Sequence, residues 1–467
     1  MRKHGWFEVD TEGLRELQAG KPKHHILREL LQNAWDENIT VCRVNLTHAN
    51  GEAVIIVEDD SPEGFRNLKD AFTLFRRSYK KTDPTKRGRF NIGEKQVIAL
   101  CHYAHIRTTK GTVVFDKDGR KEQKAKRTVG SEVELHVKIS KEEFQEILDA
   151  VQTYIPPPNT KTLLNEVEIT SRPVHKTIAA RLVSEIAGKD GILRRTIRKT
   201  EIWVHKKDGT AYLYEMGIPI CKIDCEYSLN VQQKIPLSID RETVSAAYLR
   251  DVFAATLNEL HNEVEEVSSG WVREATRDET ITKAALNSVL TKRHGEKFCV
   301  ANPFDPNAND EAISAGYAVI KGKEMSKEEW DNIKQHNLVE SSTQLFGTVQ
   351  QSGPSIEPTP QQLRVTNYAK AVAKKLLGLD IRVCFLEDRN AANAASFGLG
   401  MLNFNVGRLP TSFFSKPVSE QTTDLIIHEL AHSAGNHTEK SYHECATRLG
   451  AQLTMLALED PDFFEQF

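Results

Sequence analysis

The sequence feature that most constrains this chain is the motif HELAH near its C-terminus, in which His428 and His432 stand four residues apart. On an α-helix this spacing puts both imidazole rings on one face, so the motif predicts a pair of metal ligands. Glu429 between them is then placed beside a metal-bound water. The apolar residues Leu425 to Ile427 come directly before the motif and predict a buried helix, which a closed metal site requires.

The residues after the motif offer a third ligand. Gly435 is expected to stop the helix, and His437 follows at once. His443 and Glu444, on the next helical segment, are the alternative third ligands. Three protein ligands leave one position of a tetrahedral zinc ion open for water, which is the arrangement of catalytic zinc sites. A buried histidine pair bonded to backbone would also explain HELAH, but not the glycine and the histidine that follow it.

The stretch HELAHSAGNHTEKSYHE is similar to the compact zincin metallopeptidases of the SprT and WLM type, in which HExxH is followed by a third histidine and then an aromatic residue, here Tyr442. The resemblance covers about Asp424 to Gln452. It implies a Zn²⁺ ion and a protein substrate, with ligands His428, His432 and His437 and with Glu429 as general base. Those families usually place the third histidine one residue further along than His437. Upstream, GMLNFNVGRL has the pattern of an edge strand, which could align an extended peptide by β-addition.

A second set of motifs lies in roughly the first 150 residues. In ELLQNAWDE, Glu29, Asn33 and Asp36 occupy one helical face at offsets of four and three residues. The strand end VEDDSPEGF, the loop and helix start KRGRFNIGEKQ, and TVGSEV follow in that order. A solvated polar face would explain the first motif alone. Taken together, the four stretches resemble the sequence boxes of the GHKL ATPase superfamily, which includes gyrase B subunits, MutL proteins, heat-shock chaperones and sensor histidine kinases.

This resemblance implies a site for ATP and Mg²⁺. Glu29 would be the general base that activates the attacking water, and Asn33 would hold Mg²⁺ through its amide oxygen. Asp59 would accept a hydrogen bond from the adenine amino group, and Gly64 would let the base approach the backbone. The family's Asp-x-Gly-x-Gly motif is lengthened here by one residue and lacks its first glycine, so the adenine ligand is Asp59 or Asp60.

The resemblance also implies a lid over the phosphates. Gly88 and Gly93 would form this lid, with backbone N–H groups at a helix N-terminus facing phosphate oxygens. Lys95 would add positive charge, and Ser131 stands where the family usually has a threonine after a glycine. The middle glycine of the lid is replaced by Asn91, which tolerates positive φ better than most residues.

Further positive charges lie outside these boxes. In several GHKL proteins the next domain is a transducer that sends a lysine back to the γ-phosphate. Here NVQQKIPLSIDRE offers Lys234, and an exposed loop lysine is the alternative interpretation. The basic runs RRSYKK and LRRTIRK could contact the phosphates of a nucleic acid or could be ordinary solvated surface. The net charge of −3 gives the chain no overall basic bias, so such contact would need a local patch.

Length and hydropathy set the domain plan. A chain of 467 residues exceeds what one core can hold, and about three domains are expected. No stretch approaches ~18 consecutive apolar residues, and no apolar run follows the basic N-terminus, so we expect a cytoplasmic protein without a signal peptide or membrane span. The seven cysteines form no disulfide framework and no paired CxxC zinc motif.

We therefore expect an α+β multidomain protein in which an ATP site regulates a zinc metallopeptidase, and which forms a nucleotide-dependent homodimer. The expected parts are a GHKL ATP-binding domain (1–155), a transducer-like α+β domain (156–272), a small linking module (273–340), a linker (341–363) and a zincin domain (364–467). The alternative function is a MutL-like or chaperone-like ATP-gated clamp on nucleic acid or protein, with a structural zinc.

Overall fold

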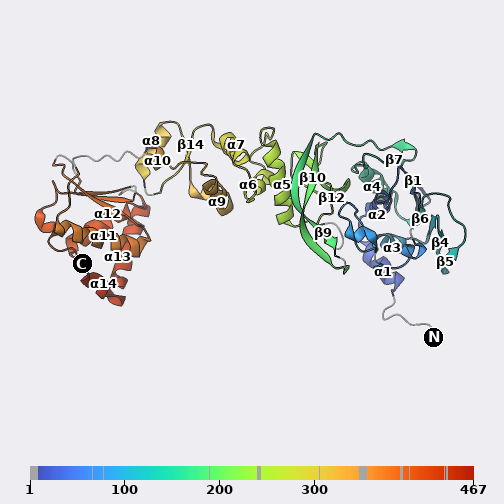
Figure 1. Ribbon diagram of the computed structural model, residues 1–467, viewed down its shortest axis with the longest axis horizontal. Helices are drawn as coiled ribbons and strands as arrows, with labels where there is room; N and C mark the ends of the chain where they lie inside the picture. The colour runs from blue at the N-terminus through green and yellow to red at the C-terminus, as the bar shows by residue number, and fades with distance from the viewer. Residues whose placement is uncertain are drawn as a thin grey trace. The chain divides into compact units, whose positions relative to one another are not determined.

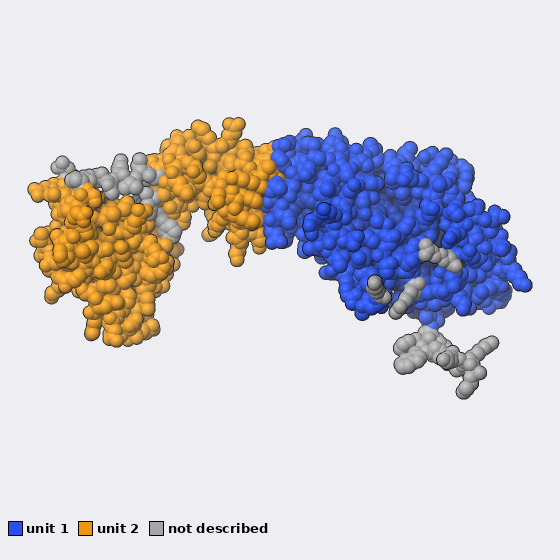
Figure 2. All heavy atoms as spheres, viewed as in Figure 1, with its two compact units in different colours: residues 1–282 blue, residues 283–467 orange. Residues whose placement is uncertain are grey.

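The chain divides into two compact units, residues 1–282 and 283–467, which are coloured separately in Figure 2. The computed structural model describes residues 9–65, 67–76, 78–188, 190–238, 243–303, 305–346, 355–389, 393–398, 400–435, 437 and 440–467. Helices and strands mix in both units, so the predicted α+β class is confirmed. Among the described residues, no helix is both long enough and apolar enough to cross a membrane.

The first sheet of the N-terminal unit has eight strands in the order β5-β4-β3-β6-β2-β1-β7-β8. Figure 1 labels β1, β4, β5, β6 and β7 of this sheet. Its strands are β1 (Val41–Ala49), β2 (Glu52–Asp59), β3 (Tyr103–Thr108), β4 (Gly111–Asp116), β5 (Gly119–Gln123), β6 (Glu132–Lys138), β7 (Lys161–Leu164) and β8 (Val167–Glu168). Alternation defines β2, because Ala53, Ile55 and Val57 are buried and the residues between them are half-buried. Neighbouring strands pair antiparallel, except that β1 and β7 are parallel.

Helices cover this sheet, and the hydrophobic core lies between the helices and the sheet. They are α1 (Thr11–Ala19), α2 (His24–Trp35), α3 (Gly93–Ile98) and α4 (Lys141–Val151), with short 3₁₀ helices η1 (Leu68–Ala71) and η2 (Tyr79–Thr82). Helix α2 contributes Ile26, Leu27, Leu30 and Leu31 to the same core as the apolar residues of β2. This apolar stripe fixes the rotation of α2 about its axis and so determines where its polar residues point.

A second sheet completes the N-terminal unit, in the order β12-β11-β13-β10-β9. Its strands are β9 (Lys176–Ala187), β10 (Leu193–Lys206), β11 (Tyr212–Glu215), β12 (Ile218–Lys222) and β13 (Tyr227–Val231), and helices α5 (Ala246–Leu260) and α6 (Gly270–Thr276) follow. The sequence put the first domain boundary at residue 155, but β7 and β8 lie beyond it and still pair in the first sheet.

The C-terminal unit begins with a series of short elements. These are α7 (Lys283–His294), β14 (Phe298–Val300), α8 (Pro306–Ser314), β15 (Ala318–Ile320), η3 (Gly322–Glu324), α9 (Lys327–Gln335) and α10 (Ser342–Phe346). Strands β14 and β15 pair in parallel, with α8 between them in the chain. Residues 347–354, the middle of the predicted linker, lie outside the described residues.

The rest of this unit combines a small sheet with long helices. Its elements are α11 (Pro360–Leu377), β16 (Arg382–Leu386), β17 (Ala395–Gly398), β18 (Met401–Asn405), η4 (Thr411–Phe414), α12 (Glu420–Ala431), α13 (Lys440–Glu459) and α14 (Asp462–Glu465). Helix α11 starts with a capping box in which Thr359 accepts from the backbone of Gln362. It ends at Gly378, whose φ of 70° is the left-handed conformation that favours glycine.

The prediction of an edge strand in GMLNFNVGRL is wrong. This segment forms β18, which lies in the centre of the sheet, parallel to β16 and antiparallel to β17. The alternation of apolar and polar residues in this segment fits an edge strand and a central strand equally well. The position of the strand in the sheet depends on its pairing with other segments, β16 and β17. Strand β17 is an edge of this sheet, and α12 packs against it.

Candidate functional site

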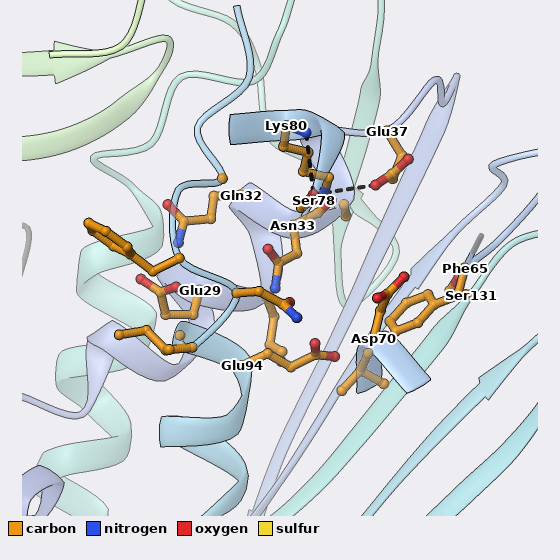
Figure 3. Close-up of a pocket in the computed structure, with 18 of the residues that line it drawn as sticks. Glu29, Gln32, Asn33, Glu37, Phe65, Asp70, Ser78, Lys80, Glu94 and Ser131 are labelled. Atoms are coloured by element: carbon orange, nitrogen blue, oxygen red, sulfur yellow. Dashed lines mark hydrogen bonds and ion pairs between the residues drawn. The ribbon is translucent and has the colours of Figure 1, made fainter. Parts of the chain in front are cut away.

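A cavity of about 350 Å³ lies in the N-terminal unit beside α2. Seven residues that the sequence predicted for the nucleotide line it: Glu29, Asn33, Asp59, Gly64, Gly88, Gly93 and Ser131. Figure 3 shows Glu29 and Asn33 on one side of the cavity and Phe65 and Ser131 on the opposite side. Residues separated by about a hundred positions in the sequence therefore share one cavity.

Glu29 is positioned by two helices. It lies on α2, one turn before Asn33, and its residue is 8% exposed. Gly93 starts α3 directly against it, and a Cβ at Gly93 would lie 1.8 Å from a carboxylate oxygen of Glu29. This approach explains the glycine, because any larger residue would displace the carboxylate or the helix.

Asp59 and Asp60 occupy different positions in the structure. Asp59 lines the cavity, and its Oδ1 accepts from the backbone N–H groups of Ser61 (2.9 Å) and Ser131 (3.2 Å). Burial raises the pKa of Asp59 to about 6, although these N–H groups act in the opposite direction. Asp60 instead accepts from the backbone N–H groups of Thr40 and Val41 at 2.8 and 3.0 Å, where it holds the start of β1.

Gly130 brings the end of β2 and the start of β6 together. Its φ is +73°, and a Cβ there would lie 1.8 Å from the carbonyl oxygen of Asp59. Its N–H donates to the carbonyl of Ser61 at 2.8 Å, and the Asp59 N–H donates to the carbonyl of Ser131 at 2.9 Å. The conformation that favours glycine thus sets Ser131 beside Asp59 at the cavity wall.

The third residue of the predicted polar face, Asp36, anchors the segment that was predicted to form the lid and does not line the cavity. Its carboxylate is fully buried and accepts from the backbone N–H groups of Arg87 and Gly88, both at 2.8 Å. Burial alone would raise its pKa, but the charges of Lys80 and Arg87 hold the pKa below its usual range. The N–H of Gly88, which we expected to face a phosphate, is thus used within the protein.

The predicted lysine of the lid, Lys95, also contacts protein groups. Its Nζ donates to Oδ1 of Asn91 at 3.1 Å and to Glu94 at 3.2 Å, and Lys95 is not among the residues that line the cavity. Asn91 has a φ of 55°, as its place in the lid predicted. Lys95 therefore holds the Asn91 turn in the structure described here.

Basic residues that the sequence interpretation had not assigned to the nucleotide line the cavity: Lys21, Arg28, Arg76, Lys80 and Arg89. Lys80 belongs to the run RRSYKK, which was considered as a nucleic-acid contact. Its Nζ lies 2.7 Å from Glu37 and 3.3 Å from the carbonyl oxygen of Asn33 (Figure 3). The positive charge of this run is visible in the sequence, but its position beside the cavity could not be predicted from the sequence.

Lys234 is buried and does not line the cavity. Its Nζ donates to the carbonyl of Lys80, and its backbone N–H donates to the carbonyl of Pro84 at 2.8 Å. Burial and the charge of Arg89 lower the pKa of Lys234 to about 8. The second sheet therefore reaches the cavity indirectly, through the segment that carries Lys80.

A second site lies in the C-terminal unit, where His428, His432 and His437 each bring a ring nitrogen within 4.8 Å of the others. His428 and His432 come from the end of α12, and His437 from the turn that follows. Nε2 of His437 lies 3.0 Å from Nε2 of His428. The spacing prediction for these three histidines thus corresponds to three convergent rings.

The other ring nitrogens are held by the protein. Nδ1 of His428 lies 2.9 Å from the hydroxyl of Tyr442, and Nδ1 of His432 lies 3.2 Å from the carbonyl oxygen of Gly435. Such partners fix ring orientation and leave Nε2 as the ligand atom, which is the usual arrangement around metal-binding histidines. Tyr442 packs against all three rings, at centroid distances of 4.9 to 5.7 Å.

The alternative third ligands point elsewhere. Nε2 of His443 lies 2.8 Å from the backbone carbonyl of His437 and so supports the turn. Glu444 is exposed and pairs with Lys440 at 2.9 Å, one turn before it on α13. Neither belongs to the group of convergent ligand atoms.

Glu429 lies on α12 between the two histidines of the motif and is 6% exposed. Burial raises the pKa of its carboxyl to about 7, and the backbone N–H of Phe397 on β17 acts in the opposite direction. A carboxyl with a pKa near neutrality can both accept and donate a proton at physiological pH.

No known family model matches this chain, and no curated protein matches it significantly. The functional interpretation therefore rests on the geometry of the two sites.

The groups available at both sites suit the cofactors that the sequence predicts. Three imidazoles are a common ligand set for catalytic Zn²⁺ and leave its fourth position for water. In the cavity, Glu29 and Asn33 offer oxygen atoms, which Mg²⁺ prefers. The basic side chains around them supply charge opposite to that of phosphates.

Proposed function

We propose that this protein is an ATP-regulated zinc metallopeptidase, in which a GHKL-type nucleotide site controls a C-terminal HExxH centre. The observation that carries the proposal is the convergence of His428, His432 and His437, with the buried carboxyl of Glu429 on the helix that carries the first two. Three protein ligands and an adjacent acid–base group are what peptide hydrolysis requires. A protein substrate is the corresponding partner.

At this centre the three imidazoles would hold zinc, which when bound lowers the pKa of a water molecule and polarises the scissile carbonyl. Glu429 would accept a proton from the attacking water and pass it to the leaving amine. Strand β17 is an edge of the small sheet and packs against α12, so an extended peptide substrate would add to the sheet there.

In the nucleotide cavity, Asp59 would accept from the adenine amino group and Asn33 would hold Mg²⁺. Lys80 and Arg28 would contact phosphate oxygens. Lys80 also pairs with Glu37, but its Coulomb attraction to a triphosphate would be stronger than its attraction to one carboxylate. Glu29 would orient and deprotonate water at the γ-phosphate. These roles require ATP hydrolysis, slow or fast, as a second activity.

Regulation would arise because ATP binds one conformation of the chain better than another. Phosphates that draw Lys80 toward the cavity would move the segment whose carbonyl accepts from Lys234. Lid closure would accompany this movement, and nucleotide-dependent homodimerisation would carry it to the peptidase unit.

The proposal is tested by two matched variants of the full chain. Glu429→Gln should abolish peptide cleavage while elemental analysis still finds the wild-type zinc content, because only the proton acceptor is lost. Glu29→Ala should abolish ATP hydrolysis while nucleotide binding persists. Cleavage of unfolded protein by Glu429→Gln at the wild-type rate would remove the peptidase assignment, and wild-type ATP turnover in Glu29→Ala would remove the assigned base.

A second candidate function is an ATP-gated clamp on nucleic acid, with the zinc structural. The observation that favours it is a two-stranded ribbon formed by β9 and residues 193–201 of β10. These residues of β10 pair with β9, whereas the pairing with β13 starts at Ile202. This ribbon places Lys199 directly opposite Arg181, and both are exposed. Like charges facing each other destabilise a sheet unless an anion binds there. Nucleic-acid binding without any peptide cleavage would favour the clamp.

A further inference from the structure

A second group of side chains of the metal-ligand type lies on the first sheet. Glu52 begins β2, His136 lies on β6, and His102 directly precedes β3. Ligand atoms of these three residues all lie within 4.8 Å of one another. Among the described residues, this closeness is shared only by the three histidines of the C-terminal unit.

The register of the sheet brings these residues together. His136 pairs with Val54 on one side and with Tyr103 on the other, so β6 lies between β2 and β3. Glu52 stands two residues before Val54 and therefore shares its face of the sheet with His136. Strand pairing thus fixes Glu52 and His136, and the backbone N–H of His102 donates to the carbonyl of His136 at 3.2 Å.

Glu52 divides its two oxygens between the two histidines. Oε2 lies 3.2 Å from Nε2 of His102, and Oε1 lies 3.0 Å from Nδ1 of His136. Without a metal, a proton on each ring nitrogen must bridge these contacts. A metal ion takes the place of such protons, because it binds the same lone pairs.

A neighbouring carboxylate orients one of the rings. Oε1 of Glu134 lies 2.7 Å from Nε2 of His136. A hydrogen on Nε2 leaves the lone pair of Nδ1 facing Glu52. Glu134 is then the outer hydrogen-bond partner that metal-binding histidines usually have. Tyr103 packs edge-on against the same ring at 5.0 Å and limits its rotation.

The site is open to solvent and lies away from the nucleotide. The side chains of His102, Glu52 and His136 are 43%, 35% and 24% exposed, so an ion can enter and keep water ligands. Glu52 and Asp59 are the first and last residues of β2. Seven residue steps along the strand separate them by roughly 23 Å, too far for one ion to serve both sites.

We propose that Glu52, His102 and His136 form a second metal site that binds a divalent first-row transition ion of the zinc type. Two imidazoles and one carboxylate suit Zn²⁺, Co²⁺ or Ni²⁺, whereas Mg²⁺ and Ca²⁺ prefer oxygen ligands. The ion bound here joins β2, β6 and the residue before β3, and so stabilises the N-terminal unit. This site is independent of the proposed peptidase activity.

A histidinium held between two carboxylates is the competing explanation of the cluster. Burial lowers the pKa of His136, but the carboxylates of Glu134 and Glu52 outweigh this effect and raise the pKa. In that case the cluster is an ion-pair network that binds no metal. The two explanations differ in metal stoichiometry and in the response of stability to added metal.

Equilibrium dialysis of the full chain against Co²⁺, followed by elemental analysis, measures the number of sites. The wild-type chain should bind two ions and His102→Ala one, with the affinity of the lost site reduced more than about tenfold. His102 is exposed enough that its removal should not unfold the chain. His48→Ala, which removes a histidine of the same sheet outside the cluster, should retain two.

Thermal unfolding of the N-terminal transition gives an independent readout. Added Co²⁺ should raise the unfolding temperature of wild type and of His432→Ala, but not of His102→Ala or Glu52→Gln. An unchanged ion count and an unchanged Co²⁺ response in both cluster variants, each compared with wild type, would overturn the proposal and leave the histidinium network.

Discussion

At the scale of single residues, Asp59 carries the most specific part of the nucleotide assignment, since it lines the cavity and Asp60 does not. Asp59→Asn should weaken ATP binding by ~1.5–3 kcal/mol, because a hydrogen bond to a charged acceptor is lost. Asp60→Asn is the matched control, since Asp60 caps β1 outside the cavity. Equal ATP affinity in wild type and Asp59→Asn, measured by titration calorimetry, would remove the role from Asp59.

The raised pKa of Asp59 predicts a pH dependence. A carboxyl with a pKa of about 6 is mostly ionised at pH 7 and mostly protonated at pH 5, so ATP affinity should fall about tenfold over this interval. In the nucleotide-free protein the sign is opposite: the folded state retains a proton that the unfolded chain releases near pH 4, so this group destabilises the fold as pH rises through 6. Asp59→Asn should flatten both profiles relative to wild type.

At the scale of elements, the approach of α3 to α2 makes Gly93 critical. Gly93→Ala should reduce ATP hydrolysis about a hundredfold, because the added Cβ would displace the Glu29 carboxylate and a displacement of ~1 Å has effects of this size. Gly20→Ala, at a position with open space around it, should leave turnover unchanged. Wild-type turnover in Gly93→Ala would show that Glu29 is not the base or that α3 moves away when ATP binds.

The segment predicted to form the lid is joined to the second sheet by a buried ion pair. Arg89 bonds Glu215 at the end of β11, and both are almost fully buried. Glu215→Leu should destabilise the N-terminal unit by ~3–5 kcal/mol, because it leaves a buried charge without its partner. Arg89→Met with Glu215→Leu should recover most of this loss in urea unfolding. A single variant that costs less than ~1 kcal/mol would mean that Arg89 finds another partner.

Elements and motifs differ in how far the sequence predicts them. The alternation of β2 and the apolar stripe of α2 are set locally, so both elements follow from the pattern. The HELAH spacing is equally local. Contacts made by strand order were not predictable: β18 is central because β16 and β17 pair on either side of it, and β7 joins the first sheet.

The same limit explains the site residues that the sequence misplaced. In the sequence Lys80 and Lys234 look like surface lysines. In the fold Lys80 lines the cavity, and Lys234 is buried with its Nζ against the backbone carbonyl of Lys80. The one-residue step between Asp59 and Asp60 was ambiguous because the motif departs from the family pattern there. The direction in which each side chain leaves the end of β2 distinguishes the two.

At the scale of the whole molecule, the proposed function requires that a nucleotide in the N-terminal unit change the activity of the C-terminal unit. Coupling of this kind needs a difference in ATP affinity between two states of the chain, typically ~1–3 kcal/mol. Lys234→Met should weaken the coupling with little effect on zinc content, because it removes the ammonium that holds the Lys80 segment.

The central claim is tested most directly by the rate of peptide cleavage by the full zinc-loaded chain, measured with and without saturating ATP and Mg²⁺. The account predicts a change of about fivefold or more, which corresponds to the lower end of allosteric coupling energies. Glu29→Ala should retain the difference, since it still binds ATP, and Asp59→Asn should lose it at the same ATP concentration. Equal cleavage rates in wild type under both conditions, with ATP shown to be bound, would contradict regulation by the nucleotide.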